Sequence, residues 1–197
     1  MNRYVHAFKS WIKPLIWITA VMMPVFEDFV FVKALLLFSP LLLMPLWSGM
    51  ARLQQKLEYV TAILMAASFL VTPGTGSALC VLPWLMARLF VANDVTMEWC
   101  RTGMPSAATA CEQMAVIFPA IGAAWLVAYR ANWTPLGFDP LIVLLTAAHF
   151  LHAGFTLPLM AGLNAKANPG CWTRFSCVAI LLGRWWPWAS PARTLAC

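Results

Sequence analysis

Residues 140–163 (PLIVLLTAAHFLHAGFTLPLMAGL) form a long apolar run without any Asp, Glu, Lys or Arg side chain. As an α-helix this run would be about 36 Å long, which exceeds the roughly 30 Å of hydrocarbon in a bilayer. A helix that is apolar on all sides is typical of a membrane span. The sequence therefore predicts at least one transmembrane helix.

The composition of the whole chain favours the same class of protein. Hydrophobic residues make up 62% of the 197 residues, charged residues make up 10%, and the mean hydropathy is +0.76. A soluble domain has about 25% charged residues, so a soluble fold of this composition would expose aggregation-prone apolar patches. The eleven Trp fit the enrichment of aromatic rings at membrane interfaces. The net charge of +6 is too thinly spread to indicate a nucleic-acid partner.

Further apolar runs are separated by polar or turn-forming segments. The predicted full or partial spans are 14–26, 29–47, 59–72, 78–92, 105–129, 140–163 and 175–188. They predict an all-α fold, a polytopic transmembrane bundle of about six or seven helices in a single integral membrane domain over residues 1–197. The spans 105–129 and 140–163 should be antiparallel neighbours, because a loop of about ten residues joins them. We interpret the tail 184–197 either as an irregular end or as the end of a truncated gene.

The basic residues at the start of the chain predict its orientation. Arg3, Lys9 and Lys13 precede the first apolar run, and Glu27 and Asp28 follow it. Cytoplasmic segments next to membrane spans carry an excess of Lys and Arg. We therefore expect a multi-pass protein of the cell (cytoplasmic) membrane with a cytoplasmic N-terminus.

With seven spans, the alternation of sides places the remaining segments. The polar segments 48–58, 93–104 and 164–174 are expected on the cytoplasmic side. The PGTGS turn and the loop 130–139 are expected on the outside. Arg130 fits an outside loop poorly, because an outside loop should be poor in basic residues.

Part of the chain resembles a known family. The segments that carry the resemblance are GAAWLVAYR (122–130), PLGFD (135–139) and LTAAHFLHAGFTLPLMAG (145–162). Over Glu112–Gly162 the chain is similar to the YndJ-like family of uncharacterised bacterial membrane proteins. The family pattern reads HFHYAGF, whereas this chain has HFLHAGF from His149 to Phe155. The resemblance implies a membrane location and a helical bundle, and it supplies no activity.

The histidines near the middle of the run 140–163 are the first site candidates. On a helical wheel Leu145, His149, His152 and Thr156 share one face. Ionisable groups inside a membrane normally face a bundle interior or a wet cavity, so we expect His149, His152 and Thr156 to point inward. They could bind a ligand, relay protons or ligate a metal or haem. The alternative is that the histidines are neutral and hydrogen-bonded between helices as packing residues.

Glu112 is the other candidate, because it lies about 10 Å inside its predicted helix. We expect it near the same cavity as His152, where it would handle protons or bind a cation. The alternative is a structural ion pair with Arg88, which the topology places near the same cytoplasmic end.

The preferred functional interpretation is a non-enzymatic membrane protein that binds or moves a small molecule or an ion through a polar spot in the bundle. One alternative is an intramembrane metal- or haem-dependent enzyme that uses His149 and His152, and another is a structural or assembly subunit. No catalytic residue and no cofactor is predicted, and the sequence shows no GxSxG, HExxH, Walker or GxGxxG motif. The expected partners are the lipid bilayer and a small-molecule or ion ligand.

Overall fold

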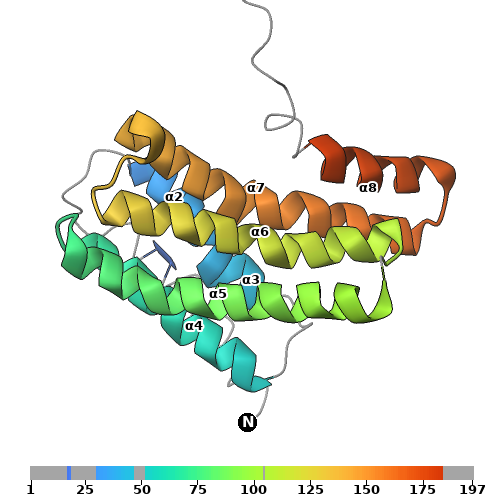
Figure 1. Cartoon of the computed structure of the whole chain (residues 1–197), viewed down its shortest axis with the longest axis horizontal. Coiled ribbons are helices and arrows are strands. Elements are labelled where there is room, and N and C mark those ends of the chain that lie inside the picture. Colours follow the sequence, from blue (N-terminus) through green and yellow to red (C-terminus); the bar gives the residue numbers. More distant parts are fainter. Residues whose placement is uncertain (1–16, 19–29, 47–51, 104, 184–197) are drawn as a thin grey trace, which may run out of the picture.

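The computed structural model describes residues 17–18, 30–46, 52–103 and 105–183. Within these ranges all regular secondary structure is helical, which confirms the predicted all-α class. Figure 1 shows long helices lying side by side, with shorter helices packed around them.

The three longest helices are long and apolar enough to cross a membrane. They are α5 (Thr75–Thr102), α6 (Ala107–Arg130) and α7 (Pro140–Ala167). α5 ends and α6 begins at one end of the bundle, which we call the Ser106 end. α6 ends and α7 begins at the opposite end, which we call the Asp139 end, and α7 returns to the Ser106 end (Figure 1).

Local sequence signals set the boundaries of these helices. Gly103 has a φ of +83°, a conformation that suits glycine, and it ends α5. The Ser106 side chain accepts a hydrogen bond from the Thr109 amide and caps α6. The Asp139 side chain accepts a hydrogen bond of 2.8 Å from the Leu141 amide and caps α7. The capping residues therefore set where each long helix ends and the next one begins.

Helices α6 and α7 are antiparallel neighbours along most of their length, as the short connecting loop predicted. Glycines allow the close approach. A Cβ atom on Gly122 would lie 2.8 Å from Leu151 Cγ, and a Cβ atom on Gly162 would lie 2.7 Å from the Ala108 carbonyl oxygen. Small residues at such contacts let helix backbones come together in a membrane, where van der Waals packing drives association.

The N-terminal part of the described chain packs against this pair. α2 (Val30–Phe38) continues through a π-helical segment, Ser39–Leu43, into the short α3 (Met44–Leu46). α2 packs against α7, and the π-helical segment contacts both α4 (Arg52–Ala67) and α7. These segments fill the side of the bundle between α4 and α7.

The chain after α4 turns at the Asp139 end. A 3₁₀ segment, Ser68–Leu70, follows α4 and leads through the PGTGS turn into α5. The guanidinium of Arg130 donates to the carbonyl oxygens of Ser68, at 2.7 Å, and of Val71. In return, the Gly74 amide donates to the Arg130 carbonyl oxygen at 2.7 Å. The PGTGS turn and the end of α6 therefore lie at the same end of the bundle, as the predicted alternation of sides requires.

The last described helix is α8 (Cys171–Gly183), which packs against α6 and α7 from the Ser106 end. Its buried contact with them is small: Cys111 of α6, Ala165 of α7 and Cys177 of α8 form a separate apolar cluster. α8 is apolar but shorter than a full span.

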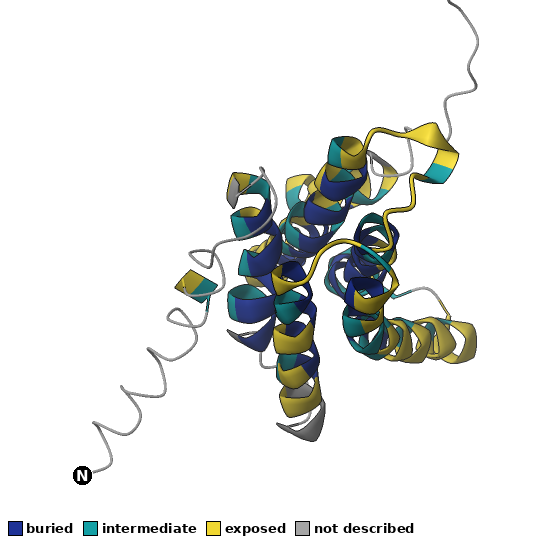
Figure 2. Ribbon diagram, turned by 90° about the vertical axis from the view of Figure 1, so that its left-hand side faces the viewer, coloured by how far each residue is buried: buried dark blue, intermediate teal, exposed yellow. Residues whose placement is uncertain are grey.

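The outer surface of the bundle is apolar. Buried residues face one another between the helices, and exposed residues face outward (Figure 2). Many of the exposed side chains are large and hydrophobic, including Phe31, Leu136 and Trp172, each more than 80% exposed. An apolar exterior over a packed interior is the surface that lipid solvates. It supports the predicted membrane class.

Several predicted boundaries were displaced. The polar segment 48–58, expected to separate two spans, is helical from Arg52 onward. The polar segment 93–104 extends α5 as far as Thr102. The first predicted run, 14–26, lies outside the described residues except for residues 17–18, and the tail 184–197 lies entirely outside them. The described part contains α2, α4, α5, α6, α7 and α8 as its principal helices.

Candidate functional site

His152 lies in a groove between α7 and α2. The groove has a volume of 280 Å³, and its walls are mainly aromatic and aliphatic. Its lining residues are Trp17, Phe31, Ala34, Leu35, Phe38 and His152. Phe31, Ala34, Leu35 and Phe38 follow one another at helical spacing, so one face of α2 forms one wall. The groove therefore combines one polar ring from α7 with an apolar face of α2.

The aromatic rings in the groove pack edge to face. The Trp17 and Phe38 ring centroids are 5.5 Å apart with an interplanar angle of 75°. The Phe38 and His152 centroids are 5.8 Å apart at 63°. The Trp17 indole nitrogen donates to the Ala34 carbonyl oxygen at 3.1 Å, which fixes its ring against α2. These contacts hold the groove wall in a defined shape.

The His152 imidazole has an unsatisfied polar atom in this apolar setting. Its Nδ1 is buried and has no hydrogen-bond partner among the described residues. A buried polar atom without a partner costs about 1–3 kcal/mol. The neighbouring Thr156 hydroxyl does not relieve this cost, because it donates to the His152 carbonyl oxygen at 2.8 Å. Among the described residues, the groove therefore leaves the Nδ1 of His152 able to bond a ligand.

His149 does not share this site. It is exposed on the outer surface of α7, as is Leu145, and its ring packs edge to face against Phe150 with 5.7 Å between centroids. The prediction that His149 points into the bundle was therefore wrong. The interior face of α7 is instead the stripe that contains Ala147, Leu151 and Gly154, because small residues permit the close contact with α6.

Glu112 also lies apart from His152. Its Oε2 accepts a hydrogen bond of 2.6 Å from Lys166 Nζ at the end of α7. Its Cγ lies where a side chain on Gly162 would be. Gly162 is ten residues beyond His152, or about 15 Å along α7. The predicted neighbourhood of Glu112 and His152 was wrong, because the antiparallel register of α6 and α7 sets Glu112 beside Gly162.

Arg88 pairs with Glu58 rather than with Glu112. The Arg88 guanidinium contacts the Glu58 carboxylate, and their side chains are 1% and 8% exposed. Arg88 Nη1 also lies 3.9 Å from Met44 Sδ. The prediction of an Arg88–Glu112 pair was wrong, because it placed Glu58 in a polar segment between two spans. Helix α4 begins before Glu58 and carries its carboxylate into the bundle, opposite Arg88 of α5.

The buried polar residues lie mostly away from α7. They are Lys33, Ser39, Glu58, Thr61, Ser68, Ser77, Arg88 and Arg130. Most belong to α2, α4 and α5 or to the short segments that follow them. Sequence reasoning missed this concentration. The sequence feature that could have indicated it is the charged Glu58 directly before an apolar run. Across residues 17–18, 30–46, 52–103 and 105–183, no three His, Cys, Asp or Glu side chains are grouped to hold a metal ion.

Comparisons with known proteins agree with the resemblance seen in the sequence. The chain is 32% identical over 108 residues to the "Uncharacterized membrane protein YndJ" of Bacillus subtilis (strain 168), a match that covers 55% of this chain. The matched part amounts to 19% of that relative, so the chain corresponds to about a fifth of its length. No solved structure matches. The pattern of the YndJ-like protein family matches residues 29–186, and the chain therefore belongs to this family of membrane proteins.

Proposed function

We propose that this membrane protein binds a small lipophilic molecule in the groove between α2 and α7, with His152 as its polar anchor. The observation that carries the proposal is the buried, unpartnered Nδ1 of His152 beside the Trp17 and Phe38 rings. Ligand sites are mostly apolar and contain a few polar groups that fix orientation. The groove has this composition.

The position of the groove indicates how a ligand would enter. Phe31 is 82% exposed and Leu35 is 39% exposed, so the wall formed by α2 opens to the outer surface of the bundle. In a membrane this surface faces lipid. A ligand dissolved in the bilayer would reach His152 laterally, without crossing water.

The chemistry of the groove limits the class of ligand. A neutral imidazole has one donor and one acceptor nitrogen, so its partner can be a hydroxyl or a carbonyl oxygen. Edge-to-face packing of Trp17, Phe38 and His152 favours a flat ring beside it. We therefore expect a lipophilic ring compound that carries a hydroxyl or carbonyl group. We do not expect a charged ion, because the apolar walls of the groove would not stabilise it.

The test compares the two histidines of α7. His152→Phe keeps a ring in the groove and removes the hydrogen bond, whereas His149→Phe makes the same change on the exposed face. The protein in lipid nanodiscs is labelled with an alkyl phenol that carries a diazirine, and the labelled peptides are mapped. Loss of one hydrogen bond to a buried group should weaken binding by about 5- to 30-fold.

The expected result is labelling of α2 and α7 peptides in the wild type and in His149→Phe, and a reduction of this labelling in His152→Phe by about 5- to 30-fold at low probe concentration. Equal labelling of all three proteins would show that His152 does not anchor the probe. Labelling that is confined to other helices would contradict the site itself.

A further inference from the structure

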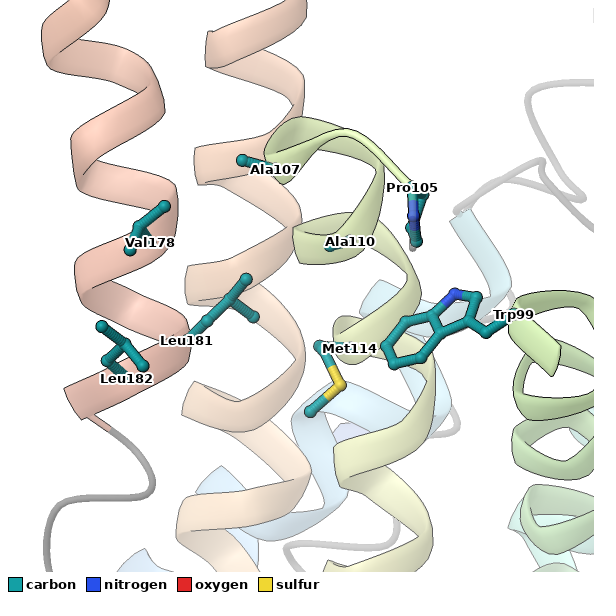
Figure 3. A pocket seen from close by; sticks show the side chains of 8 residues that line it. All are labelled: Trp99, Pro105, Ala107, Ala110, Met114, Val178, Leu181 and Leu182. Carbon is teal, nitrogen blue, oxygen red and sulfur yellow. The ribbon is translucent and has the colours of Figure 1, made fainter. Parts of the chain in front are cut away.

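A second groove lies at the Ser106 end, far from His152, and it runs along α6 between α5 and α8 (Figure 3). Its volume is 460 Å³, within the range of about 300–1,000 Å³ that is typical of ligand sites. The Trp99 indole forms one wall, Val178 and Leu181 form the other, and Ala110 and Met114 lie between them. The side chains that line the groove are almost entirely apolar.

Both walls of this groove are held by specific contacts. The Trp99 indole nitrogen donates to Gln113 Oε1, and the Gln113 amide in turn donates to Glu98 Oε2 at 3.3 Å. On the other side, the Cys111 thiol donates to the Cys177 carbonyl oxygen at 3.5 Å, which ties α8 to α6. The groove is therefore a built feature and not a gap between loosely placed helices.

The α8 side of the groove mouth carries positive charge, whereas the exposed Glu98 carboxylate lies on the Trp99 side. Arg174 is exposed and precedes Val178 by four residues on α8, so the two share the face that borders the groove. The N-terminus of α6, where Ser106 is exposed, lies at the same end and contributes the positive end of a helix dipole. An apolar groove with a cationic mouth complements a molecule that has an apolar tail and an anionic head.

The size of the groove argues for a narrow occupant. A helix with its side chains is about 10–12 Å across. A single hydrocarbon chain is much thinner, and the surrounding bilayer supplies such chains.

We propose that this groove binds an acyl chain of an anionic phospholipid from the leaflet at the Ser106 end, with its phosphate beside Arg174. The proposal is independent of the His152 groove, which lies on another face and between other helices.

The test uses phosphatidylglycerol and phosphatidylcholine that carry a diazirine in one acyl chain, with the full chain reconstituted in nanodiscs. Ala107→Trp fills the groove, and Ala124→Trp places the same ring on the exposed face of the same helix. Neither arginine is a lining residue. Arg174→Gln removes the cation on the α8 face that borders the groove, and Arg101→Gln removes an exposed cation two residues from Trp99, on a different face of α5.

In the wild type, both lipids should label peptides of α6 and α8, and phosphatidylglycerol should do so about fivefold more strongly, the effect of one cation near a phosphate. Ala107→Trp should abolish this labelling, and Ala124→Trp should not. Arg174→Gln should remove the preference for phosphatidylglycerol, and Arg101→Gln should retain it. Inorganic phosphate should not compete with the lipid, because the acyl chain supplies most of the contact.

Three results would overturn the proposal. Equal labelling by both lipids in the wild type would show that the groove does not recognise an anionic head group. If Ala107→Trp and Ala124→Trp are labelled to the same extent, the acyl chain does not lie in this groove. Lipid labelling in the wild type that misses the peptides of α6 and α8 would leave the groove without an acyl chain.

Discussion

The guanidinium carbon of Arg130 lies 4.8 Å from the centroid of the Phe69 ring, in the buried interior at the Asp139 end. This contact, together with the hydrogen bonds from Arg130 to Ser68 and Val71, accounts for a basic residue at the predicted outer end. The charge serves the packing of α6 against the 3₁₀ segment and does not form part of an exposed loop. Arg130 therefore carries no information about which side of the membrane its loop occupies.

We expect Arg130→Met to destabilise the protein by about 2–4 kcal/mol, because buried carbonyl oxygens lose a charged donor. Thermal unfolding in detergent measures this as a lower Tm. Arg101→Met, on the exposed part of α5, is the control and should leave Tm almost unchanged. Equal stability of the two variants would show that the buried contacts of Arg130 contribute little.

Mutations can distinguish the Arg88–Glu58 ion pair from the Arg88–Glu112 pair that was predicted from the sequence. Glu58→Gln should cost about 3–5 kcal/mol, because it leaves Arg88 buried without its counter-ion. The double variant Arg88→Met/Glu58→Met should be less destabilised than the sum of its single variants, since the orphan charge is gone.

Arg88→Met combined with Glu112→Gln supplies the comparison for that cycle. The two changes should be additive within about 0.5 kcal/mol, because Glu112 is bonded to Lys166 and shares no partner with Arg88. A large interaction free energy between Arg88 and Glu112 would instead support the ion pair that was predicted from the sequence.

The close contact of α6 and α7 makes a prediction about glycine. Gly162→Ala should destabilise the protein by about 1–3 kcal/mol, because its Cβ would meet the Ala108 backbone, which cannot turn aside. Gly76→Ala, in the first turn of α5, has nothing within 4 Å of its Cβ and should be neutral or slightly stabilising. Chemical denaturation in mixed micelles compares the free energies of unfolding of the two variants. Similar values would mean that α6 and α7 can move apart at Gly162 without loss of stability.

The distribution of exposed cations predicts the orientation of the bundle. The exposed Lys and Arg side chains of the described residues are Lys56, Arg101, Lys166 and Arg174, at the Ser106 end or in the first turns of α4. By the positive-inside rule this end should face the cytoplasm.

Cysteine labelling in intact cells measures the orientation. In a background without other cysteines, Thr134→Cys in the loop at the Asp139 end should react with a membrane-impermeant maleimide. The native Cys171 at the Ser106 end should react only after permeabilisation. Labelling of Cys171 from outside would reverse the orientation, and labelling of both from outside would contradict the alternation of α6 and α7.

Sequence reasoning reached the helices whose signals are local. The bounds of α6 and α7 follow from an apolar run, a capping Ser or Asp and a Gly-Phe-Asp turn, and their antiparallel contact follows from the short loop. These features depend on residues that are close in the chain, so the pattern of residue types was sufficient. Membership of the YndJ-like family was visible for the same reason, since its motifs are contiguous.

The amino-acid sequence by itself determined the class of this protein: apolar runs of this length have to be helices in lipid, where every backbone amide needs an internal partner. It did not determine which face of α7 is buried, because Thr156 and His152 mark one stripe and Ala147 and Gly154 mark another. The tertiary structure decided in favour of the small residues, since close helix packing in a membrane gains more from backbone approach than from burying a histidine. The same packing brings α2 to His152 and Glu58 to Arg88, contacts between distant segments that no local pattern encodes.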